Sequence, residues 1–267
     1  MRVLFVGDII SKTGRRALRE GLYDLRSSRD IDLVIANVEN AAGIFGITEK
    51  VIKEIKSSGV DIMTSGNHVW DKREGITLLD TRDDIIRPAN YPPMVPGKGF
   101  AIKQFNGARI SVINIQGRIF MTPIDCPFRA MDEILKMLPT DTVIKIVDFH
   151  AEATSEKVAM GYYLDGKVSA VIGTHTHVQT ADEKILPMGT AYLTDAGMTG
   201  PVESVIGVKK EQIIDRFITG IPSRMIVAHG DSMINGALID IDEKTGKAHS
   251  IERIHIEIGD GSEGEGF

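Results

Sequence analysis

VSAVIGTHTH, at residues 168–177, is an apolar run that ends in glycine and then in two histidines separated by a threonine. A continuous apolar run of this length predicts a strand over 168–172 that is covered on both faces. His175 and His177 are alternate residues of an extended segment, so their side chains point the same way. Two such imidazoles repel each other when protonated and commonly share a metal ion. The stretch therefore predicts a buried α/β-type strand with metal ligands at its carboxyl end.

Similar apolar runs recur on both sides of this stretch and alternate with segments of helical periodicity. The runs predict strands at 3–6, 33–38, 62–64, 110–115, 143–147, 191–193, 225–228 and 237–241. Helical spacing of apolar residues predicts helices around 18–25, around 51–55 after a cap at Thr48, and around 131–138. Residues 254–258 alternate between isoleucine and polar side chains, which predicts an edge hairpin with 237–241 that turns at 243–247. This alternation of strands and helices is typical of an α/β layered fold.

The composition is that of an ordinary globular protein, with 267 residues of which 42% are hydrophobic and 25% charged. A chain of this length can bury about three quarters of its extended surface, so we expect any metal to be functional and not structural. No internal repeat or flexible linker divides the sequence. We therefore expect a single domain over residues 1–258 and a flexible tail over 259–267. The proline-containing stretch 87–97 is expected to be a surface loop.

Charge and cysteine content argue against several classes of protein. The 31 basic and 37 acidic residues give a net charge of −6, which opposes capture of duplex DNA. A small phosphorylated substrate is still allowed, because metal ions can reverse the field inside a cleft. The single Cys126 cannot form an internal disulfide, which favours the reducing cytoplasm. No run approaches the ~20 apolar residues of a membrane span, and MRVLFVGD is too short for a signal peptide, so neither export nor membrane insertion is expected.

Polar side chains that can bind metals follow the other predicted strands. Because the carboxyl ends of the strands in an α/β sheet meet at one edge, these side chains are expected to lie together with the two histidines. They are Asp8 after RVLFVG, Glu39 and Asn40 after LVIANV, Asn67 and His68 after DIMTSG, and His150 after VIKIVDF.

Each of these residues also has a simpler interpretation when taken alone. Asp8 is placed where a helix cap often occurs, and Glu39 with Asn40 could be ordinary turn residues. A single histidine at a strand end is more often a satisfied core or surface group than a ligand. Five strand ends with the same property make coincidence improbable. His249 and His255 are best explained as surface residues, whereas a substrate-side role stays open for His229.

The motifs GD at 7–8, GNH at 66–68, His150 and GTHTH at 173–177 together resemble those of the calcineurin-like metallophosphoesterases. More narrowly, GDIISKTGR, NVENAAGIFGIT, SGNHVWD, RPANYP, DFHAEATSEK and TDAGMTGP resemble the bacterial YmdB-like phosphodiesterases. The motifs keep this order over most of the chain. The resemblance implies a four-layer α/β/β/α sandwich, in which two packed mixed sheets are flanked by helices.

The sequence departs from the broad superfamily at two positions. Ile10 stands where the usual Asp-x-His motif has a histidine, and the bridging acid of the usual Gly-Asp pair is replaced by Glu39 followed by Asn40. Both departures are similar to what the YmdB-like subfamily shows. They leave the number of ligands and the metal preference open.

The resemblance implies two divalent metal ions per chain, with iron or manganese favoured and zinc or nickel also compatible with ligands that lack thiolate. It implies the following ligand set: Glu39 as the bridge, Asp8, His177 and Asn40 mainly on one ion, and Asn67, His150 and His175 mainly on the other. His68 is implied to be catalytic, as a proton donor or charge-neutralising group at the leaving oxygen. Asp148, Glu152 and Asp195 lie beside the motifs and could orient ligands.

The implied activity is hydrolysis of a small phosphodiester, namely a 3′,5′- or 2′,3′-cyclic nucleotide, by a hydroxide that bridges the two ions. A phosphomonoesterase or 5′-nucleotidase, an RNA-directed nuclease, and a regulatory protein that signals through a partner surface are the alternatives, and a homo-oligomer stays open. No motif places an arginine or lysine beside a ligand, which favours diesters over monoesters. Arg87 and Arg118 are candidates for substrate contacts that the sequence does not assign.

Overall fold

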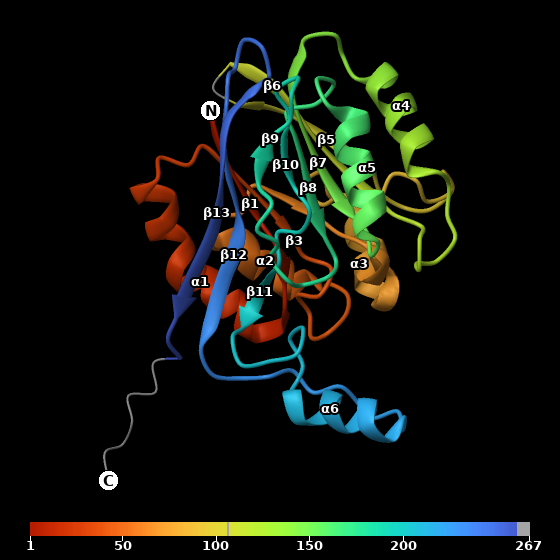
Figure 1. Ribbon diagram of the computed structural model, residues 1–267, viewed down its shortest axis with the longest axis vertical. Coiled ribbons are helices and arrows are strands. Elements are labelled where there is room, and N and C mark those ends of the chain that lie inside the picture. Colours follow the sequence, from red (N-terminus) through yellow and green to blue (C-terminus); the bar gives the residue numbers. More distant parts are fainter. Residues whose placement is uncertain (106, 261–267) are drawn as a thin grey trace.

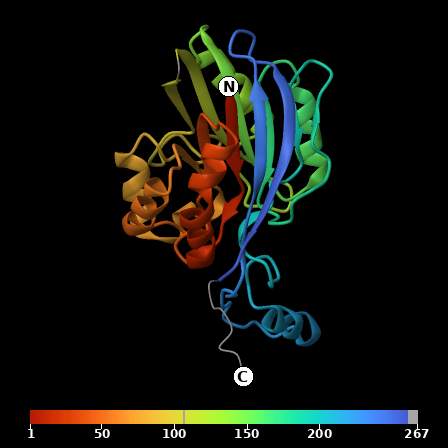
Figure 2. The same cartoon turned by 90° about the vertical axis from the view of Figure 1, so that its left-hand side faces the viewer.

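The computed structural model describes residues 1–105 and 107–260, and part of the expected tail, 261–267, lies outside the described residues. Two mixed β-sheets pack face to face, and helices cover their outer faces (Figures 1 and 2). This arrangement confirms the expected α/β/β/α layers. No helix in the described part of the chain is long and apolar enough to cross a membrane.

The first sheet has the strand order β2-β11-β12-β1-β3-β4, with β13 paired to β12. Its strands β1, β3 and β4 run parallel, whereas β12 runs antiparallel to β1. The strands are β1 (Arg2–Val6), β2 (Asp8–Ile9), β3 (Leu33–Asn37), β4 (Ile62–Thr64), β11 (Met198–Pro201), β12 (Ser232–Ile241) and β13 (Ala248–Ile258). The antiparallel β12–β13 pair forms a hairpin at the predicted place, but both strands are longer than predicted, so residues 254–258 pair with 232–236 and not with 237–241.

The second sheet has the order β5-β6-β7-β8-β10-β9, in which the four central strands are parallel. The outer strands β5 and β9 are antiparallel to their neighbours. The strands are β5 (Phe100–Phe105), β6 (Ala108–Gln116), β7 (Thr142–His150), β8 (Ala170–Thr174), β9 (Lys184–Ile185) and β10 (Ala191–Leu193).

The helices cover the outer face of each sheet with their apolar stripes. α1 (Ser11–Ser28), α2 (Glu49–Ser57) and α3 (Arg73–Thr81) accompany the first sheet, whereas α4 (Pro127–Met137) and α5 (Thr154–Leu164) accompany the second. The predicted cap is present, because Thr48 Oγ1 accepts a hydrogen bond from Val51 N–H at the start of α2. The short helix η1 (Asn67–Asp71) follows β4, and α6 (Lys210–Thr219) projects from one end of the molecule (Figure 1).

Three apolar clusters hold these layers together. The middle cluster lies between the sheets and joins residues such as Phe5 and Ile35 of the first sheet to Ile146 and Ile172 of the second. The other two clusters lie between each sheet and its helices. The continuous apolar runs of the central strands follow from this arrangement, because both faces of each strand are covered.

Residues 225–228 do not form the predicted strand. Their main chain pairs with residues 207–209 instead, through Lys209 N–H to Ile226 O at 2.9 Å and Ala228 N–H to Gly207 O at 3.0 Å. The side chain of Gln212 also binds this segment, because its Oε1 accepts a hydrogen bond from Ile226 N–H at 2.9 Å. With their polar groups satisfied locally, these apolar residues do not join a sheet.

The stretch 87–97 is a loop, as expected, and it is exposed at residues 92–94 but buried at its start. Arg87 is buried, and its guanidinium donates hydrogen bonds to the main-chain oxygens of Pro88, Val95 and Pro96. The positively charged side chain therefore folds the stretch around itself.

Candidate metal centre

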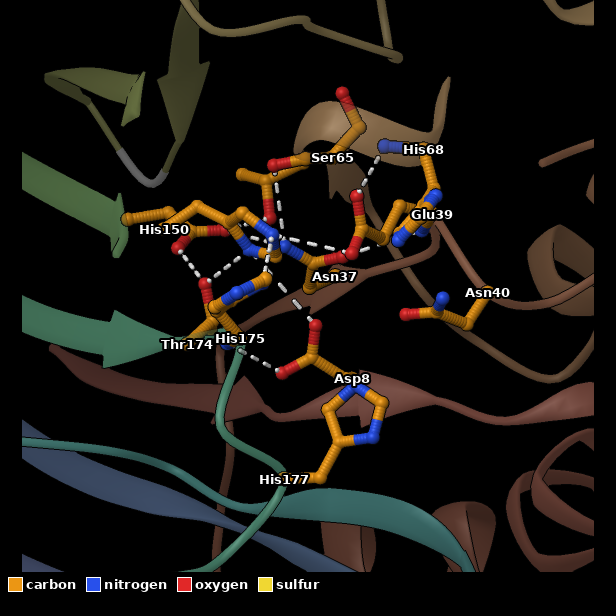
Figure 3. Close-up of polar contacts among 12 residues, drawn as sticks. Asp8, Asn37, Glu39, Asn40, Ser65, His68, His150, Thr174, His175 and His177 are labelled. Carbon is orange, nitrogen blue, oxygen red and sulfur yellow. Dashed lines mark hydrogen bonds and ion pairs between the residues drawn. The ribbon is translucent and has the colours of Figure 1, made fainter. Parts of the chain in front are cut away.

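The predicted site residues come together where the strands of both sheets end (Figure 3). Asp8 lies in β2 of the first sheet, Glu39 and Asn40 directly follow β3, and Asn67 and His68 begin η1 after β4. The second sheet contributes His150 at the end of β7, and His175 and His177 after β8. All of these ends lie at one edge of the sandwich because the contributing strands are parallel within each sheet.

The centre of the site is Nε2 of His150. It lies 3.1 Å from Asn67 Oδ1, 3.0 Å from His175 Nδ1 and 3.1 Å from Glu39 Oε1. Ligand atoms bound to one divalent ion at about 2.0–2.2 Å are about 3 Å apart, so these four atoms have the spacing of a coordination shell. Glu39, His150 and His175 each offer a ligand atom, and the three atoms lie within 4.8 Å of one another.

Two buried oxygen atoms also indicate that the site accepts cations. Asp8 Oδ1 and Asn40 Oδ1 have no hydrogen-bond partner among the described residues. Buried polar atoms are normally paired, so unpaired acceptors of this kind point to a missing positive partner. Gly66 leaves room for the cluster, because a Cβ there would lie 2.2 Å from His150 Nε2 and 2.5 Å from Glu39 Oε2. The donor set therefore fits divalent metal ions.

Neighbouring side chains fix the orientation of the two central imidazoles. His150 Nδ1 lies 2.9 Å from Thr174 Oγ1, and that hydroxyl donates to Asp148 Oδ1 at 2.7 Å. His175 Nε2 lies 3.1 Å from Glu152 Oε2. Carboxylates that hold the second nitrogen of a ligating histidine set its tautomer and raise its basicity. Asp148 and Glu152 thus lie where the sequence analysis suggested orienting groups.

The charges of the cluster depend strongly on one another. Burial alone raises the pKa of Glu39, but the charge and hydrogen bond of His150 outweigh burial and lower that pKa to about 2. Burial alone lowers the pKa of His150, but Glu39 and Asp8 raise it to about 9. Burial and the charge of His150 lower the pKa of His175 to about 3. Without metal, a proton on His150 therefore balances the carboxylates, and a divalent cation would replace that proton.

Two groups near the centre keep their protons more readily than usual. Burial raises the pKa of Asp8, against the opposing charges of His177 and His150. Burial also raises the pKa of Asp148 to about 7, although Thr174, Thr64 and His150 favour its ionised form. Both carboxyl groups therefore resist ionisation in the metal-free protein, and a bound cation would favour their ionised forms.

The backbone is strained at His175 and His177. His175 has φ +98° and His177 has φ +66°, a region that side chains other than glycine rarely adopt. Strain of this kind occurs mostly at functional sites, where the surrounding structure enforces it. Lys157 of α5 and Asp195 supply that enforcement, because their buried ion pair of 2.6 Å is hydrogen-bonded to Thr174 O and to Thr176 N–H.

The residues expected at the other ion are less closely assembled. Asp8 Oδ2 accepts a hydrogen bond from His175 N–H at 3.1 Å, which places Asp8 beside the central cluster. His177 lies beyond Asp8, with its Nδ1 3.1 Å from Ile206 O (Figure 3). The amide of Asn40 donates to Ile44 O at 2.7 Å and leaves its oxygen free to bind a cation. Asp8 is not a helix cap, because the cap position of α1 is Ile10.

His68 stands apart from the ligand atoms. Its main-chain N–H donates to Glu39 Oε2 at 2.9 Å, whereas its ring nitrogen Nδ1 lies 2.9 Å from Asp71 Oδ2. The ring stacks on Phe45 with centroids 4.1 Å apart. Asp71 and Phe45 were not singled out from the sequence. The i, i+3 spacing of His68 and Asp71 would have indicated their contact had the short helix η1 been recognised.

A cavity of about 450 Å³ opens over the cluster, and Glu39, His68, His175 and His177 line it. Arg87 and Arg118 do not line this cavity, and they contribute instead to a separate cavity beside α4. The 450 Å³ volume is within the range of small-molecule sites, about 300–1,000 Å³.

The α/β/β/α sandwich, with polar side chains gathered at one edge of its sheets, is the fold of the metallophosphoesterases. A crystal structure described as a putative 5′-nucleotidase from Staphylococcus aureus matches with a TM-score of 0.60 and 12% identity, over 95% of this chain and 54% of that one. This likeness concerns the fold alone.

The chain belongs to the YmdB-like protein family, whose model matches residues 4–254, as the motifs predicted. A Bacillus subtilis relative named 2′,3′-cyclic-nucleotide 2′-phosphodiesterase is 48% identical, over 96% of this chain and 97% of the relative. A crystal structure described as a novel phosphatase from Mycoplasma pneumoniae is 35% identical with a TM-score of 0.92, over 98% of this chain and 95% of that one.

Proposed function

We propose that the protein is a metal-dependent phosphodiesterase that opens 2′,3′-cyclic nucleotides. The observation that carries this proposal is the convergence of Glu39, Asn67 and His175 on His150 Nε2, at 3.0–3.1 Å. The name of the Bacillus subtilis relative supports the substrate class, as does its 48% identity over nearly the whole chain. Phosphodiester hydrolysis is also the activity that the sequence motifs imply.

The cluster would hold two divalent ions, with Glu39 between them. Asn67, His150 and His175 would bind one ion, and Asp8, Asn40 and His177 the other. Bound there, such ions supply Lewis acidity and lower the pKa of a water molecule enough for attack at neutral pH. The ligand types favour manganese or iron and are compatible with zinc or nickel.

The chain's own residues would position the substrate and move the proton. Hydrolysis forms a new phosphorus–oxygen bond from water and breaks the bond between phosphorus and O2′, and the departing O2′ takes up a proton. His68 faces the cavity, and Asp71 together with Phe45 fixes its ring. We assign His68 the donation of that proton, which corresponds to general acid catalysis.

The test compares 2′,3′-cyclic AMP, 3′,5′-cyclic AMP and 5′-AMP under one metal condition, after removal and defined return of manganese or iron. We expect the highest kcat/KM for 2′,3′-cyclic AMP, with 3′-AMP as the product. Because no motif places a cation beside the ligands for a second phosphate charge, 5′-AMP should be the poorest substrate. Faster release of phosphate from 5′-AMP would replace the proposal with a phosphomonoesterase. No turnover of any substrate with any metal would favour a regulatory binding protein.

The number of metal ions is a separate prediction. Elemental analysis after purification without chelator should give two ions per chain. Glu39→Gln should weaken both ions together, because a bridging ligand belongs to both. A stoichiometry of one that added manganese or iron does not change would contradict the two-ion site. Loss of a single ion from the variant would assign the bridge to another residue.

A further inference from the structure

A second cavity, of about 890 Å³, adjoins the cavity over the metal centre. The two cavities share Ile44, Phe45 and Met225 in their walls, so they lie next to each other at these apolar residues. The first cavity alone is within the usual size range of a small-molecule site. The second cavity therefore provides space for more than the single nucleotide that the proposed reaction requires.

The walls of the second cavity are held by specific contacts. One wall is the loop 42–45 with Asp71 and Lys72, and the other is the segment 224–229. Gln212 of α6 fixes the second wall by hydrogen bonds to Arg224 O at 3.2 Å and from Ile226 N–H at 2.9 Å. The stem of Lys72 lies over Gly46, where an added Cβ would come within 2.9 Å of Lys72 Cγ. The cavity is thus preformed.

The charged groups of the second cavity favour an anion. Lys72, Arg224 and His229 line it, and none of the three side chains has an ion-pair partner among the described residues. The one carboxylate in its lining, Asp71, is already bonded to His68 Nδ1 at 2.9 Å. A local surplus of positive charge therefore exists in a protein whose net charge is −6. Exposed Phe45 adds an aromatic surface at the junction of the two cavities.

The chemistry of the proposed substrate limits the position at which a longer molecule can continue from the cyclic nucleotide. In a 2′,3′-cyclic nucleotide both 2′ and 3′ oxygens belong to the ring at phosphorus, so a longer molecule can continue only through O5′. In nucleic acid that continuation is a phosphodiester followed by another ribonucleotide. An anionic phosphate would meet Lys72 and Arg224, and the next base could stack on an aromatic face, as occurs in single-strand binding proteins.

We infer that the protein acts on RNA 3′ ends that carry a 2′,3′-cyclic phosphate, with the second cavity binding the nucleotide that precedes the terminal one. This inference rests on the proposed function and names the substrate class of the same site. Arg224 and Lys72 bind the internal phosphate, and His229 lies at the same wall. The terminal cyclic phosphate occupies the cavity over the metal cluster.

The first experiment compares a triadenylate ending in a 2′,3′-cyclic phosphate with 2′,3′-cyclic AMP. We expect kcat/KM to be at least tenfold higher for the trinucleotide at 50 mM salt. One neutralised internal phosphate predicts that this advantage falls roughly 2.6-fold between 50 and 200 mM salt, because binding of single strands weakens with a slope of about −0.7 per phosphate neutralised. Equal kcat/KM for both substrates would overturn the inference while leaving the proposed function intact.

A 5′-phosphorylated 2′,3′-cyclic AMP distinguishes a nucleotide subsite from a simple phosphate site. It carries the anion but not the preceding nucleotide. We expect it to lie between the other two substrates in kcat/KM. If it equals the trinucleotide, the second cavity recognises only a phosphate, and the inference about RNA ends is wrong.

Variants of the cavity wall test the assignment of residues. Lys72→Met and Arg224→Met should each lower the ratio of trinucleotide to mononucleotide kcat/KM by about threefold to tenfold, and Arg224→Lys should restore most of it. The matched control is Lys244→Met, an exposed lysine in the β12–β13 turn at the opposite end of the molecule from α6 (Figure 1). A ratio that falls equally in Lys244→Met, or in none of the variants, would contradict the assignment.

A binding measurement separates this inference from the chemistry of the metal centre. Fluorescence anisotropy of a labelled triadenylate with a 3′-phosphate, in the presence of chelator, should show weaker binding to Arg224→Met than to the unchanged protein. If 2′,3′-cyclic AMP is not hydrolysed under any metal condition, the proposed function fails, yet this measurement still reports on the cavity. Equal binding by the variant and the unchanged protein overturns the inference by itself.

Discussion

His68 is joined to the metal cluster through its main chain and not through its ring. Its N–H holds Glu39, and its ring is held by Asp71 and Phe45. Replacement by alanine keeps the main-chain contact and removes the imidazole. We therefore expect His68→Ala to retain both metal ions while kcat falls by roughly 10²–10⁴-fold, the usual range for a general acid.

Elemental analysis and steady-state kinetics on the same preparation check this prediction. The loss should shrink for bis-p-nitrophenyl phosphate, because its leaving group needs little protonation. A drop in metal content would show that the ring of His68 is itself a ligand. An equal loss with both substrates would show that His68 orients the site without donating a proton.

The buried pair of Lys157 and Asp195 is a second feature at the scale of single residues. Both side chains are 1% exposed, and Asp195 also accepts hydrogen bonds from Thr176 and from Gly197 N–H. Lys157→Met removes one partner and leaves a buried carboxylate uncompensated. The free energy of unfolding should fall by about 3–5 kcal/mol, measured by urea titration of the metal-free protein.

The double variant Lys157→Met, Asp195→Asn provides the control for this prediction. It removes both charges, so it should recover part of the stability lost in the single variant. If the single variant is no less stable than the unchanged protein, the pair does not hold the strained histidine loop.

The sequence was informative about the residues at the strand ends and much less so about the residues that support them. Apolar runs that end in polar side chains are visible in one dimension, and parallel strands bring their ends together. Thr174 and Lys157 act through contacts between β7, β8 and α5, and no spacing in the sequence encodes those contacts. Asp71 is an i, i+3 neighbour of His68, but that spacing is informative only once the short helix η1 is recognised. Sequence alone therefore suggested the cluster and the neighbouring carboxylates Asp148 and Glu152, but not Thr174 or Lys157.

At the scale of elements, amphipathic spacing was sufficient for α1, α2 and α4. It failed for α5, because the buried face of that helix carries Glu156 and Lys157 and so lacks an apolar period. It failed for β11 because MTGP contains proline and glycine, although its backbone pairs with both β2 and β12. Both elements lie next to the metal cluster, and neither has the regular spacing of apolar residues by which a helix or strand is recognised in a sequence.

An ion-pair network links α2 to the segment that follows α3. Asp84 accepts hydrogen bonds from Arg82 Nε and Nη2 at 2.9 and 2.7 Å, and Lys56 Nζ of α2 lies 3.1 Å from it. Burial alone would raise the pKa of Asp84, but Arg82 and Lys56 lower it below its ordinary value. The folded protein therefore ionises Asp84 more readily than the unfolded chain does.

The sign of this shift predicts a pH-dependent stability difference. A lowered pKa stabilises the fold above the unfolded-state pKa, and the contribution is lost as pH falls through the folded-state value. Asp84→Asn should therefore lower the free energy of unfolding by about 1 kcal/mol or less at pH 7, in keeping with the partial exposure of the network. Urea titrations at pH 7 and pH 3 should show that the difference becomes smaller in acid, and a difference that does not decrease between these pH values would have another cause.

At the scale of the whole molecule, the metal centre depends on how the two sheets pack against each other. Asp8 and Glu39 come from one sheet, and His150 and His175 from the other. Ile239 of β12 is fully buried between the two sheets. Leu22 of α1 is equally buried, but it lies between that helix and the first sheet. Ile239→Ala and Leu22→Ala should each lower the free energy of unfolding by about 2–5 kcal/mol.

The two variants should differ in metal affinity. We expect Ile239→Ala to weaken metal binding severalfold, because loss of packing between the sheets loosens the spacing of ligands from both. Leu22→Ala should leave metal affinity nearly unchanged. Competition with a chromophoric chelator measures both, and equal affinities would show that the ligand loops hold their geometry without the inter-sheet core.

The position of β12 has a consequence for how the protein is made. This strand lies between β1 and β11, yet it comes from residues 232–241, long after the last predicted ligand, His177. A nascent chain that has emerged from the ribosome to residue 220 thus carries every ligand but lacks the strand that closes the first sheet around Asp8. The first sheet therefore cannot close around Asp8 until residues 232–241 have been synthesised, and before then the predicted ligands are not held in the arrangement of the finished site.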